Sequence, residues 1–197
     1  MKSMTRKLLV WGFGVAGLLL SGFCAYQLLD ARFFQARESM RLEEALRPGA
    51  TRNSPVIPER RPPRKTGSLV GRLEIPRLHL SAIVLEGSDD RTLDRGVGRV
   101  SQTADPGQSG NVVLGGHRDT FFRPLRGIRT GDEIRVTTPA GRFRYRVDWT
   151  RVVDPKETDV LQATSAPSLT LVTCYPFRYI GSAPERFIVR ARQLASN

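Results

Sequence analysis

The stretch RFRYRVDW, at residues 142–149, decides the fold class of this chain. Apolar side chains occupy every second position of the stretch, at Phe143, Tyr145, Val147 and Trp149. Because successive side chains of a β-strand point to opposite faces, this period of two predicts a strand with one buried and one solvated face. We therefore expect Trp149 to lie in the core.

Other short apolar runs give the chain after residue 67 the same texture. Gly, Pro and Asp interrupt these runs at intervals of about 8 to 15 residues, which is typical of an all-β domain. We expect short helical turns at residues 89–94 and 158–163. Seven or eight strands over about 130 residues indicate a barrel or a sandwich. The remaining runs lie at residues 69–75, 80–85, 111–114, 133–137, 168–174 and 186–192.

Length and composition limit what this chain can be. Its 197 residues suffice for one domain core with accessory segments, and 40% hydrophobic with 25% charged residues is a globular composition. The net charge of +12 suits nucleic acid, an anionic membrane or a polyanionic envelope polymer, so charge alone does not choose a partner. Two cysteines and two histidines, His79 and His117, exclude a disulfide-stapled scaffold and a histidine-rich metal site.

Residues 8–29, LLVWGFGVAGLLLSGFCAYQLL, carry no charge. A helix of this length, at about 1.5 Å per residue, reaches roughly 33 Å and is long enough for a hydrocarbon core about 30 Å thick. Basic residues precede it and favour a cytoplasmic N-terminus at residues 1–7. We expect an uncleaved single-pass anchor in the cell membrane with an extracytoplasmic domain. A cleaved signal peptide is the alternative, although its apolar region usually spans about 7 to 15 residues.

Residues 30–67 are expected to link this anchor to a folded domain at residues 68–197. The segment begins with a charged, helix-compatible stretch at residues 31–46. It continues as a basic, Pro-rich stretch, which favours an extended spacer over a packed segment.

Cys174 stands out because the only other cysteine lies within the apolar segment. A free thiol outside the cytoplasm is either safely buried or reactive, and a lone strand cysteine is more often buried. Cys174, however, ends the run SLTLVTC and is followed by Tyr175 and Pro176, where the chain turns and side chains reach solvent. This position favours a reactive thiol.

His117 and Arg186 also lie at predicted strand ends. His117 follows NVVLGG, and Arg186 opens the last predicted strand, so both can meet Cys174 at one rim of a barrel. A non-interacting thiol and imidazole would form a thiolate–imidazolium pair only about 1% of the time at pH 7. A guanidinium brought beside the sulfur by an antiparallel return would favour the thiolate and donate hydrogen bonds to an oxyanion.

Residues 68–197 resemble the sortase family, and most closely its class D branch. The resemblance is carried by Gly116 and His117 in LGGHRDTFF, by TLVTC at residues 170–174, and by Arg186 in RFIVRA. It implies a closed, eight-stranded sortase-type β-barrel with short helices. It also implies a membrane-anchored cysteine transpeptidase that cleaves an LPxTG-like sorting signal between Thr and Gly (or Ala).

The resemblance further implies a role for each matching residue. Cys174 would be the nucleophile that forms a thioester, and His117 would be the general acid and base. Arg186 would stabilise the oxyanion, with support from Thr173. The implied partners are secreted proteins with a C-terminal sorting signal, an amine acceptor of the cell envelope and the membrane, but no nucleic acid. No cofactor and no metal are implied.

Several carboxylates and alternatives complete the expectations. Asp89, Asp90 and Asp94 are interpreted as a solvated turn rather than a calcium site, and Asp119 as a loop carboxylate rather than a group that orients His117. An L,D-transpeptidase is disfavoured because its His-Gly and Ser-x-Gly-Cys signature is absent. The non-enzymatic alternative is a membrane-anchored β-barrel that binds an anionic envelope polymer and buries its cysteine.

Overall fold

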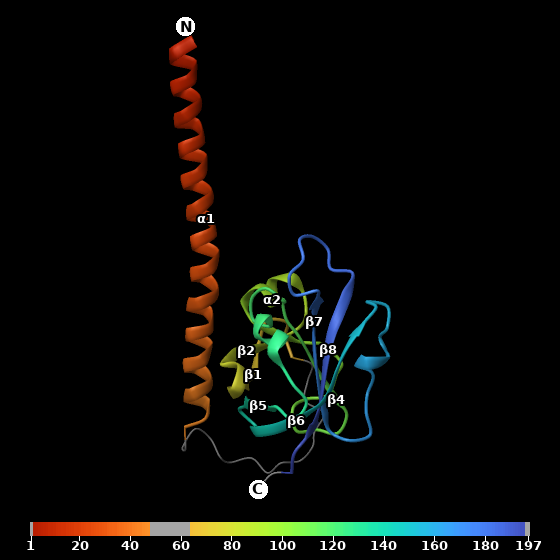
Figure 1. The fold of residues 1–197 in the computed structure, drawn as a ribbon. Coiled ribbons are helices and arrows are strands. Elements are labelled where there is room, and N and C mark those ends of the chain that lie inside the picture. The colour runs from red at the N-terminus through yellow and green to blue at the C-terminus, as the bar shows by residue number, and fades with distance from the viewer. Residues whose placement is uncertain (1, 48–63, 196–197) are drawn as a thin grey trace.

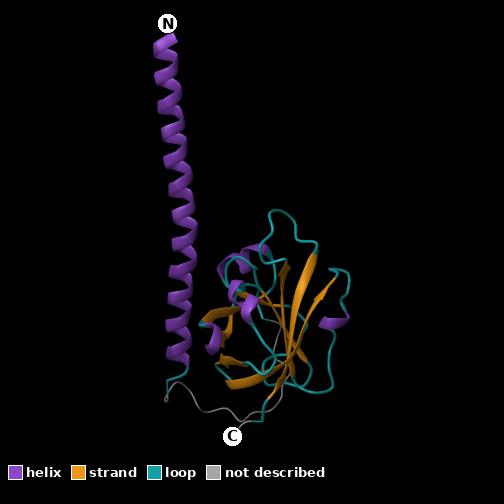
Figure 2. Ribbon diagram, in the orientation of Figure 1, coloured by secondary structure: helices purple, strands orange, loops and turns teal. Residues whose placement is uncertain are grey.

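The computed structural model describes residues 2–47 and 64–195, with residues 2–10 and 24–28 described by their backbone alone. Most of the Pro-rich part of the predicted linker, residues 48–63, lies outside the described residues. The chain forms one long N-terminal helix beside a small β-barrel (Figure 1). Loops and short helical turns surround the barrel (Figure 2).

Eight strands close into a barrel, which confirms the predicted fold class. Around the barrel the order is β1-β2-β3-β4-β7-β8-β6-β5, and β5 pairs back with β1. The strands are β1 (Leu69–Ile75), β2 (Leu80–Glu86), β3 (Val97–Arg99), β4 (Asn111–Gly115), β5 (Glu133–Thr138), β6 (Gly141–Val153), β7 (Ser168–Tyr175) and β8 (Glu185–Gln193).

Strand β7 lies between two partners of opposite direction. It runs parallel to β4 and antiparallel to β8. The C-terminal ends of β4 and β7 and the N-terminal end of β8 therefore lie at the same edge of the barrel. This arrangement brings the end of β4 to the place where the consecutive strands β7 and β8 meet.

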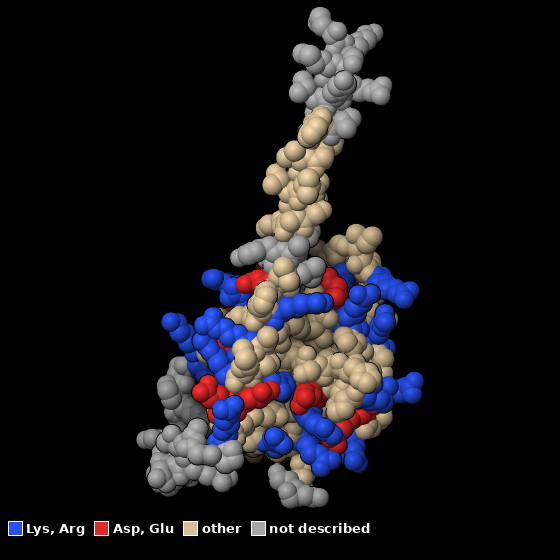
Figure 3. All heavy atoms as spheres, turned by 90° about the vertical axis from the view of Figure 1, so that its left-hand side faces the viewer, with Lys and Arg blue, Asp and Glu red and all other residues tan. Residues whose placement is uncertain are grey.

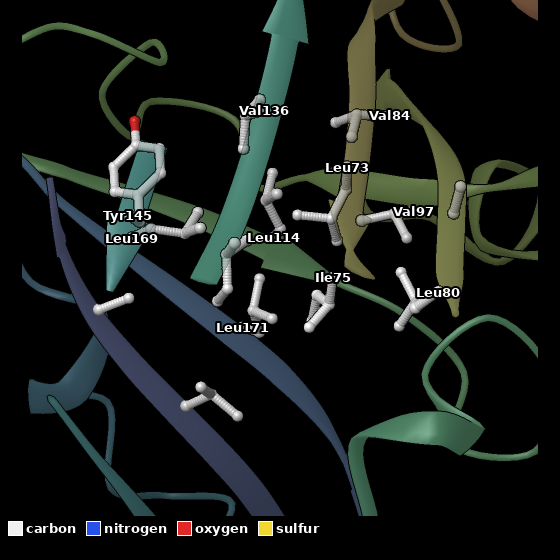
Figure 4. Packing of buried hydrophobic residues seen from close by; sticks show 14 of the residues in the cluster. Leu73, Ile75, Leu80, Val84, Val97, Leu114, Val136, Tyr145, Leu169 and Leu171 are labelled. Atoms are coloured by element: carbon white, nitrogen blue, oxygen red, sulfur yellow. The ribbon is translucent and has the colours of Figure 1, made fainter. Parts of the chain in front are cut away.

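The barrel interior is filled by the apolar side chains that the alternation predicts. Leu73, Leu114 and Leu171 come from different strands and are fully buried in one cluster (Figure 4). Burying a side chain of this size contributes roughly 1.5–3 kcal/mol to the free energy of unfolding. Tyr145 joins the same cluster, and its burial raises the pKa of the phenol to about 12.

Trp149 does not lie in the core, so that prediction was wrong. The pairing of β6 with β8 shifts register between Val147 and Trp149, as at a β-bulge. Val147 faces the core, but the shift turns Trp149 to the outer face opposite Arg190. There the Trp149 ring lies 5.1 Å from the guanidinium carbon of Arg151 and 5.6 Å from that of Arg190.

Short elements complete the barrel. The predicted helical turns appear as α2 (Asp90–Arg95) and the 3-10 turn η3 (Asp159–Leu161), and two further 3-10 turns are η1 (Pro76–Leu78) and η2 (Arg123–Gly127). Strand β3 has three residues and was not predicted, because so short a segment shows no periodicity. His79 is exposed and lies in a left-handed turn at the end of η1.

Helix α1 (Lys2–Ala45) docks its C-terminal part on the barrel. Leu42 is 1% exposed, and the Gln35 amide accepts a hydrogen bond from the Ile83 N–H (2.8 Å) and donates one to the Arg95 carbonyl (2.6 Å). The predicted linker therefore does not begin as a free spacer, since its first residues form a helix packed on β2 and α2.

The N-terminal part of α1 extends beyond the barrel. Its described side chains are apolar and exposed there, including Trp11 (75%), Phe13 (77%) and Leu18 (76%), and Figure 3 shows no charged side chain on this part. Within residues 2–47 and 64–195, no helix is long and apolar enough to cross a membrane. The anchor at residues 8–29 stays a prediction.

Candidate active site

Cys174 and Arg186 are direct cross-strand partners in the pairing of β7 with β8. Side chains of directly opposed residues have Cβ atoms about 4.5–5.5 Å apart. The neighbouring pair, Thr173 and Phe187, faces the barrel interior, so Cys174 and Arg186 share the outer face. Cys174 is half-buried, and this register sets the Arg186 side chain next to it on the outer face.

His117 reaches the same edge through β4. Gly115 pairs with Val172, and contact continues past the strand end because the Gly116 N–H donates to the Val172 carbonyl (3.2 Å). One further residue along each chain beyond Gly116 and Thr173 brings His117 to the level of Cys174. The predicted meeting of these strand ends is therefore found in the structure.

A glycine before the histidine is required by packing. A Cβ atom on Gly116 would lie 2.8 Å from Cδ2 of Phe122, a fully buried ring of the core. The chain after His117 also folds back, since the Phe122 N–H donates to the His117 carbonyl (3.0 Å). The position of the histidine backbone therefore depends on this close contact.

Thr173 makes a contact different from the oxyanion support expected of it. Its side chain is 2% exposed and its hydroxyl donates to the Gly116 carbonyl (2.7 Å). Thr173 points to the face of β7 opposite Cys174. The contact that the structure shows joins β7 to the segment that carries His117.

Arg186 is half-buried and directed toward its own loop. Its Nη1 donates to the carbonyls of Ala183 (3.2 Å) and Glu185 (2.9 Å). These bonds hold the guanidinium at the start of β8, beside the strand position of Cys174. The guanidinium has further N–H donors that these bonds do not use, and donors of this kind stabilise a developing oxyanion.

Asp94 is the acidic neighbour of His117, which the sequence did not identify. Its Oδ1 lies 3.5 Å from Nε2 of His117, although its side chain is 72% exposed. Asp89 instead caps α2, where hydrogen bonds from Thr92 lower the pKa of its carboxyl. Asp119 is exposed, and no ion pair joins it to His117 among the described residues.

No group of three metal-ligating side chains occurs in the described part of the chain. The predicted solvated turn at Asp89, Asp90 and Asp94 is thus partly a cap and partly a neighbour of His117. The acidic residues were visible in the sequence, but the packing of α2 beside the end of β4 was not.

Buried Asn111 and half-buried Arg190 hold the loop between β6 and β7, residues 154–167, which begins after Val153, the strand partner of Arg186. Asn111 donates to the carbonyls of Val160 (3.4 Å) and Gln162 (3.1 Å). Arg190 donates to the Val160 carbonyl (2.6 Å), and burial lowers the pKa of its guanidinium. The loop is therefore fixed to the outer face of β4 and β8, near the start of β7.

The arrangement combines the groups that acyl transfer requires. Cys174 is half-buried opposite Arg186 on the paired strand, and His117 follows the end of the adjacent parallel strand at the same level. A thiol with a neighbouring base and a donor for an oxyanion can form and resolve a covalent acyl intermediate.

Comparisons with known proteins agree with this chemistry. The Sortase domain family model matches residues 73–194. Sortase D of Bacillus subtilis (strain 168) is 32% identical over 189 residues, which cover 91% of this chain and 94% of the relative. Among solved structures, the Sortase D5 transpeptidase of Clostridium perfringens superposes with a TM-score of 0.61 at 30% identity, covering 66% of this chain and 82% of that one.

Sortase C-1 from Actinomyces oris superposes with a TM-score of 0.59 at 33% identity, covering 64% of this chain and 73% of that one. The family match, the relative and both structures confirm the predicted resemblance. The chain belongs to the sortase family and is a cysteine transpeptidase.

Proposed function

We propose that this chain is a membrane-anchored sortase that cleaves an LPxTG-like sorting signal between Thr and Gly (or Ala) and transfers the protein to an amine of the cell envelope. The observation that carries the proposal is the register that sets Cys174 opposite Arg186, with His117 at the end of the adjacent parallel strand. Family membership supports the reaction class, and the substrate and acceptor follow from it by resemblance.

The reaction proceeds in two half-reactions. The Cys174 thiolate attacks the carbonyl carbon of the scissile peptide bond, and Arg186 stabilises the resulting oxyanion. His117 gives a proton to the departing amine nitrogen, the C–N bond breaks and a thioester remains. An acceptor amine then attacks the thioester, gives its proton to His117 and releases the Cys174 thiolate. One amide replaces another, so no external energy source is required.

The proposed anchor is supported by the exposed apolar part of α1. Trp11, Phe13 and Leu18 lie on a helix that extends beyond the barrel, whereas its C-terminal part packs on the barrel. Exposed apolar surface of this extent is costly in water and is covered by lipid in the proposed orientation. Carbonate extraction of cell membranes tests the anchor: the full chain is expected in the pellet, and a chain starting at Asp30 in the supernatant.

Intact-protein mass spectrometry tests the proposed reaction directly. The full chain in detergent is incubated with peptides that contain an LPxTG-type sequence or its scrambled version, and acylation of Cys174 by the N-terminal product is expected only with the former. Added hydroxylamine, an amine nucleophile, should release the acyl group and raise turnover. Cys174→Ala should abolish the adduct and leave the melting temperature near that of the wild type.

The same experiment separates this proposal from a polymer-binding barrel. An inert Cys174, seen as no acylation with any peptide and no labelling by a thiol reagent, would favour the binding module.

A further inference from the structure

Arg118, the residue after His117, reaches across to the loop between β7 and β8, residues 176–184. Its Nη1 donates to the Pro176 carbonyl (3.1 Å), and its Nη2 donates to the carbonyls of Tyr179 (2.9 Å) and Gly181 (3.1 Å). The guanidinium carbon also lies 5.7 Å from the centroid of the Tyr179 ring. One side chain thus contacts the beginning, the middle and the later part of the loop.

The loop has few other ties to the barrel. No backbone N–H of residues 177–183 donates to another backbone carbonyl among the described residues. Its tip is not held by burial, since Tyr179 is 49% exposed and Ile180 is fully exposed. Phe177 packs against the Tyr175 and Phe187 rings near the base of the loop. Beyond that base, the contacts of Arg118 are the main restraint on the conformation of the loop.

The chemistry of the contact requires an arginine. A guanidinium carries five N–H donors in a rigid planar fork and can bond several carbonyls at once, while stacking on an aromatic ring. The ammonium group of lysine has three donors at a single point and does not reproduce this geometry.

We infer that Arg118 is a positioning residue that ties the β7–β8 loop to the segment carrying His117. The inference rests on the proposed function, because this loop connects Cys174 on β7 to Arg186 on β8. Loosening the loop would widen the range of separations among thiol, imidazole and guanidinium. It would also release the loop that follows directly after Cys174 and Tyr175.

The experiment compares Arg118→Gln and Arg118→Lys with a matched control, Arg142→Gln, using the full chain in detergent. Arg142 is exposed, makes no hydrogen bond through its side chain among the described residues, and lies at the opposite end of β6 from Val153, the partner of Arg186. Three quantities are measured: the melting temperature, the rate of chymotrypsin cleavage after Tyr179, and kcat and KM for a sorting-signal peptide.

For Arg118→Gln we expect chymotrypsin cleavage after Tyr179 to accelerate by on the order of tenfold, with little change in melting temperature. We expect kcat/KM to fall by about tenfold to a hundredfold, with KM raised and kcat lowered, because misplacement by about 1 Å has effects of this size. For Arg118→Lys we expect kcat/KM to stay severalfold below the wild-type value, and for Arg142→Gln we expect the wild-type value.

The inference is overturned if Arg118→Gln is cleaved at the wild-type rate, or if cleavage accelerates while kcat and KM stay unchanged. Full recovery of both readouts by Arg118→Lys would overturn the requirement for the guanidinium fork. The cleavage assay needs no substrate peptide. If the wild-type chain acts on no sorting signal, the proposed function fails while the tie between Arg118 and the loop is still measured.

Discussion

Gly116 shows at the residue scale how a missing side chain positions the proposed base. The space that a Cβ atom would need is occupied by the Phe122 ring, which is itself buried in the barrel core. The carbonyl of the same glycine accepts the Thr173 hydroxyl, so this residue joins β7 to the His117 segment. A peptide group without a side chain thus lies between the core and the site.

Gly116→Ala should lower the free energy of unfolding by about 1–3 kcal/mol, because the added methyl overpacks against Phe122. It should also lower kcat by on the order of tenfold or more, since His117 is displaced. Urea unfolding and peptide cleavage measure both effects. Gly115→Ala is the matched control, because its Cβ would meet nothing closer than the Gly98 carbonyl oxygen at 3.9 Å. Equal effects of the two substitutions would contradict this account.

Sequence reasoning reached the residues of the site through local signals. The position of Cys174 before a turn and of Arg186 at the start of a strand indicated their meeting, and β7 and β8 pair these two residues directly. Asp94 and Arg118 were missed, because their contacts join segments whose packing no local pattern encodes. The prediction for Trp149 was wrong because a bulge exchanges the inner and outer faces of a strand. The alternation of apolar and polar residues in the sequence does not reveal it.

At the element scale, the buried side chain of Asn111 holds the loop between β6 and β7. Asn111 is 2% exposed, and its Oδ1 accepts from the hydroxyls of Thr170 (2.7 Å) and Ser168 (3.3 Å), while its amide holds the β6–β7 loop. The loop conformation therefore depends on a residue from the start of β4.

Asn111→Ala should lower the free energy of unfolding by about 1–3 kcal/mol, because the fully buried Thr170 hydroxyl loses its acceptor. The freed loop should raise KM for the sorting-signal peptide more than it lowers kcat. Thermal unfolding and steady-state kinetics give the two readouts. Gln162→Ala, an exposed position in the same loop, should leave the melting temperature unchanged. An unchanged KM in Asn111→Ala would exclude this role for the loop.

Helix α1 covers the part of β2 that has no strand partner on the β3 side. Strand β3 pairs with β2 only at residues 84–86, so the earlier part of β2 lacks a strand neighbour on that edge. Gln35 supplies an acceptor for the Ile83 N–H there and also binds the end of α2 at Arg95. This docking could not be foreseen from the sequence, because a charged helix followed by prolines is equally compatible with a free spacer.

Gln35→Ala should lower the free energy of unfolding of the barrel by about 1–3 kcal/mol, because the Ile83 N–H loses its partner in a buried place. The melting temperature of the full chain in detergent measures this loss. Arg37→Ala, an exposed position on the same helix, is the control and should be neutral. If both variants have the melting temperature of the wild type, α1 does not dock as described.

At the scale of the whole molecule, arginines outnumber carboxylates, and several carboxylates form ion pairs with arginines. Side-chain hydrogen bonds from Arg144 and Arg135 lower the pKa of Glu133 to about 2, and Arg77 lowers the pKa of Asp132. A carboxylate whose pKa is lower in the folded chain stabilises the fold while it is ionised.

The stability of the barrel should therefore decline as pH falls from about 4.5, the ordinary value for Glu, toward about 2, the folded-state pKa of Glu133. Above that window the contribution of this carboxylate is fully present, because both states are ionised. Urea unfolding between pH 7 and pH 2 measures the slope. Glu133→Gln should flatten it, and Glu74→Gln, which has no side-chain hydrogen bond among the described residues, should not. Identical slopes in all three proteins would refute the assignment.

The all-β class was predictable because the strands alternate and the turns contain Gly, Pro and Asp. That pattern left a barrel and a sandwich both open, and the closed eight-stranded barrel was implied by the family resemblance. Closure removes the unpaired strand edges that an open sheet leaves. The three-residue β3 and the docked helix depend on contacts made only after closure. The edge that carries Cys174, His117 and Arg186 is a product of the order in which β4, β7 and β8 pair.

The central claim is that these three side chains act on one substrate as a unit, and a double-mutant cycle tests it most directly. The value of kcat/KM for a sorting-signal peptide is measured in His117→Ala, Arg186→Ala and the double variant, with melting temperatures as the check on folding. Groups that act in one step are strongly non-additive. The account predicts that kcat/KM of the double variant lies within about tenfold of kcat/KM of the slower single variant. If the fold-losses of the two single variants instead multiply in full in the double variant, the account is contradicted.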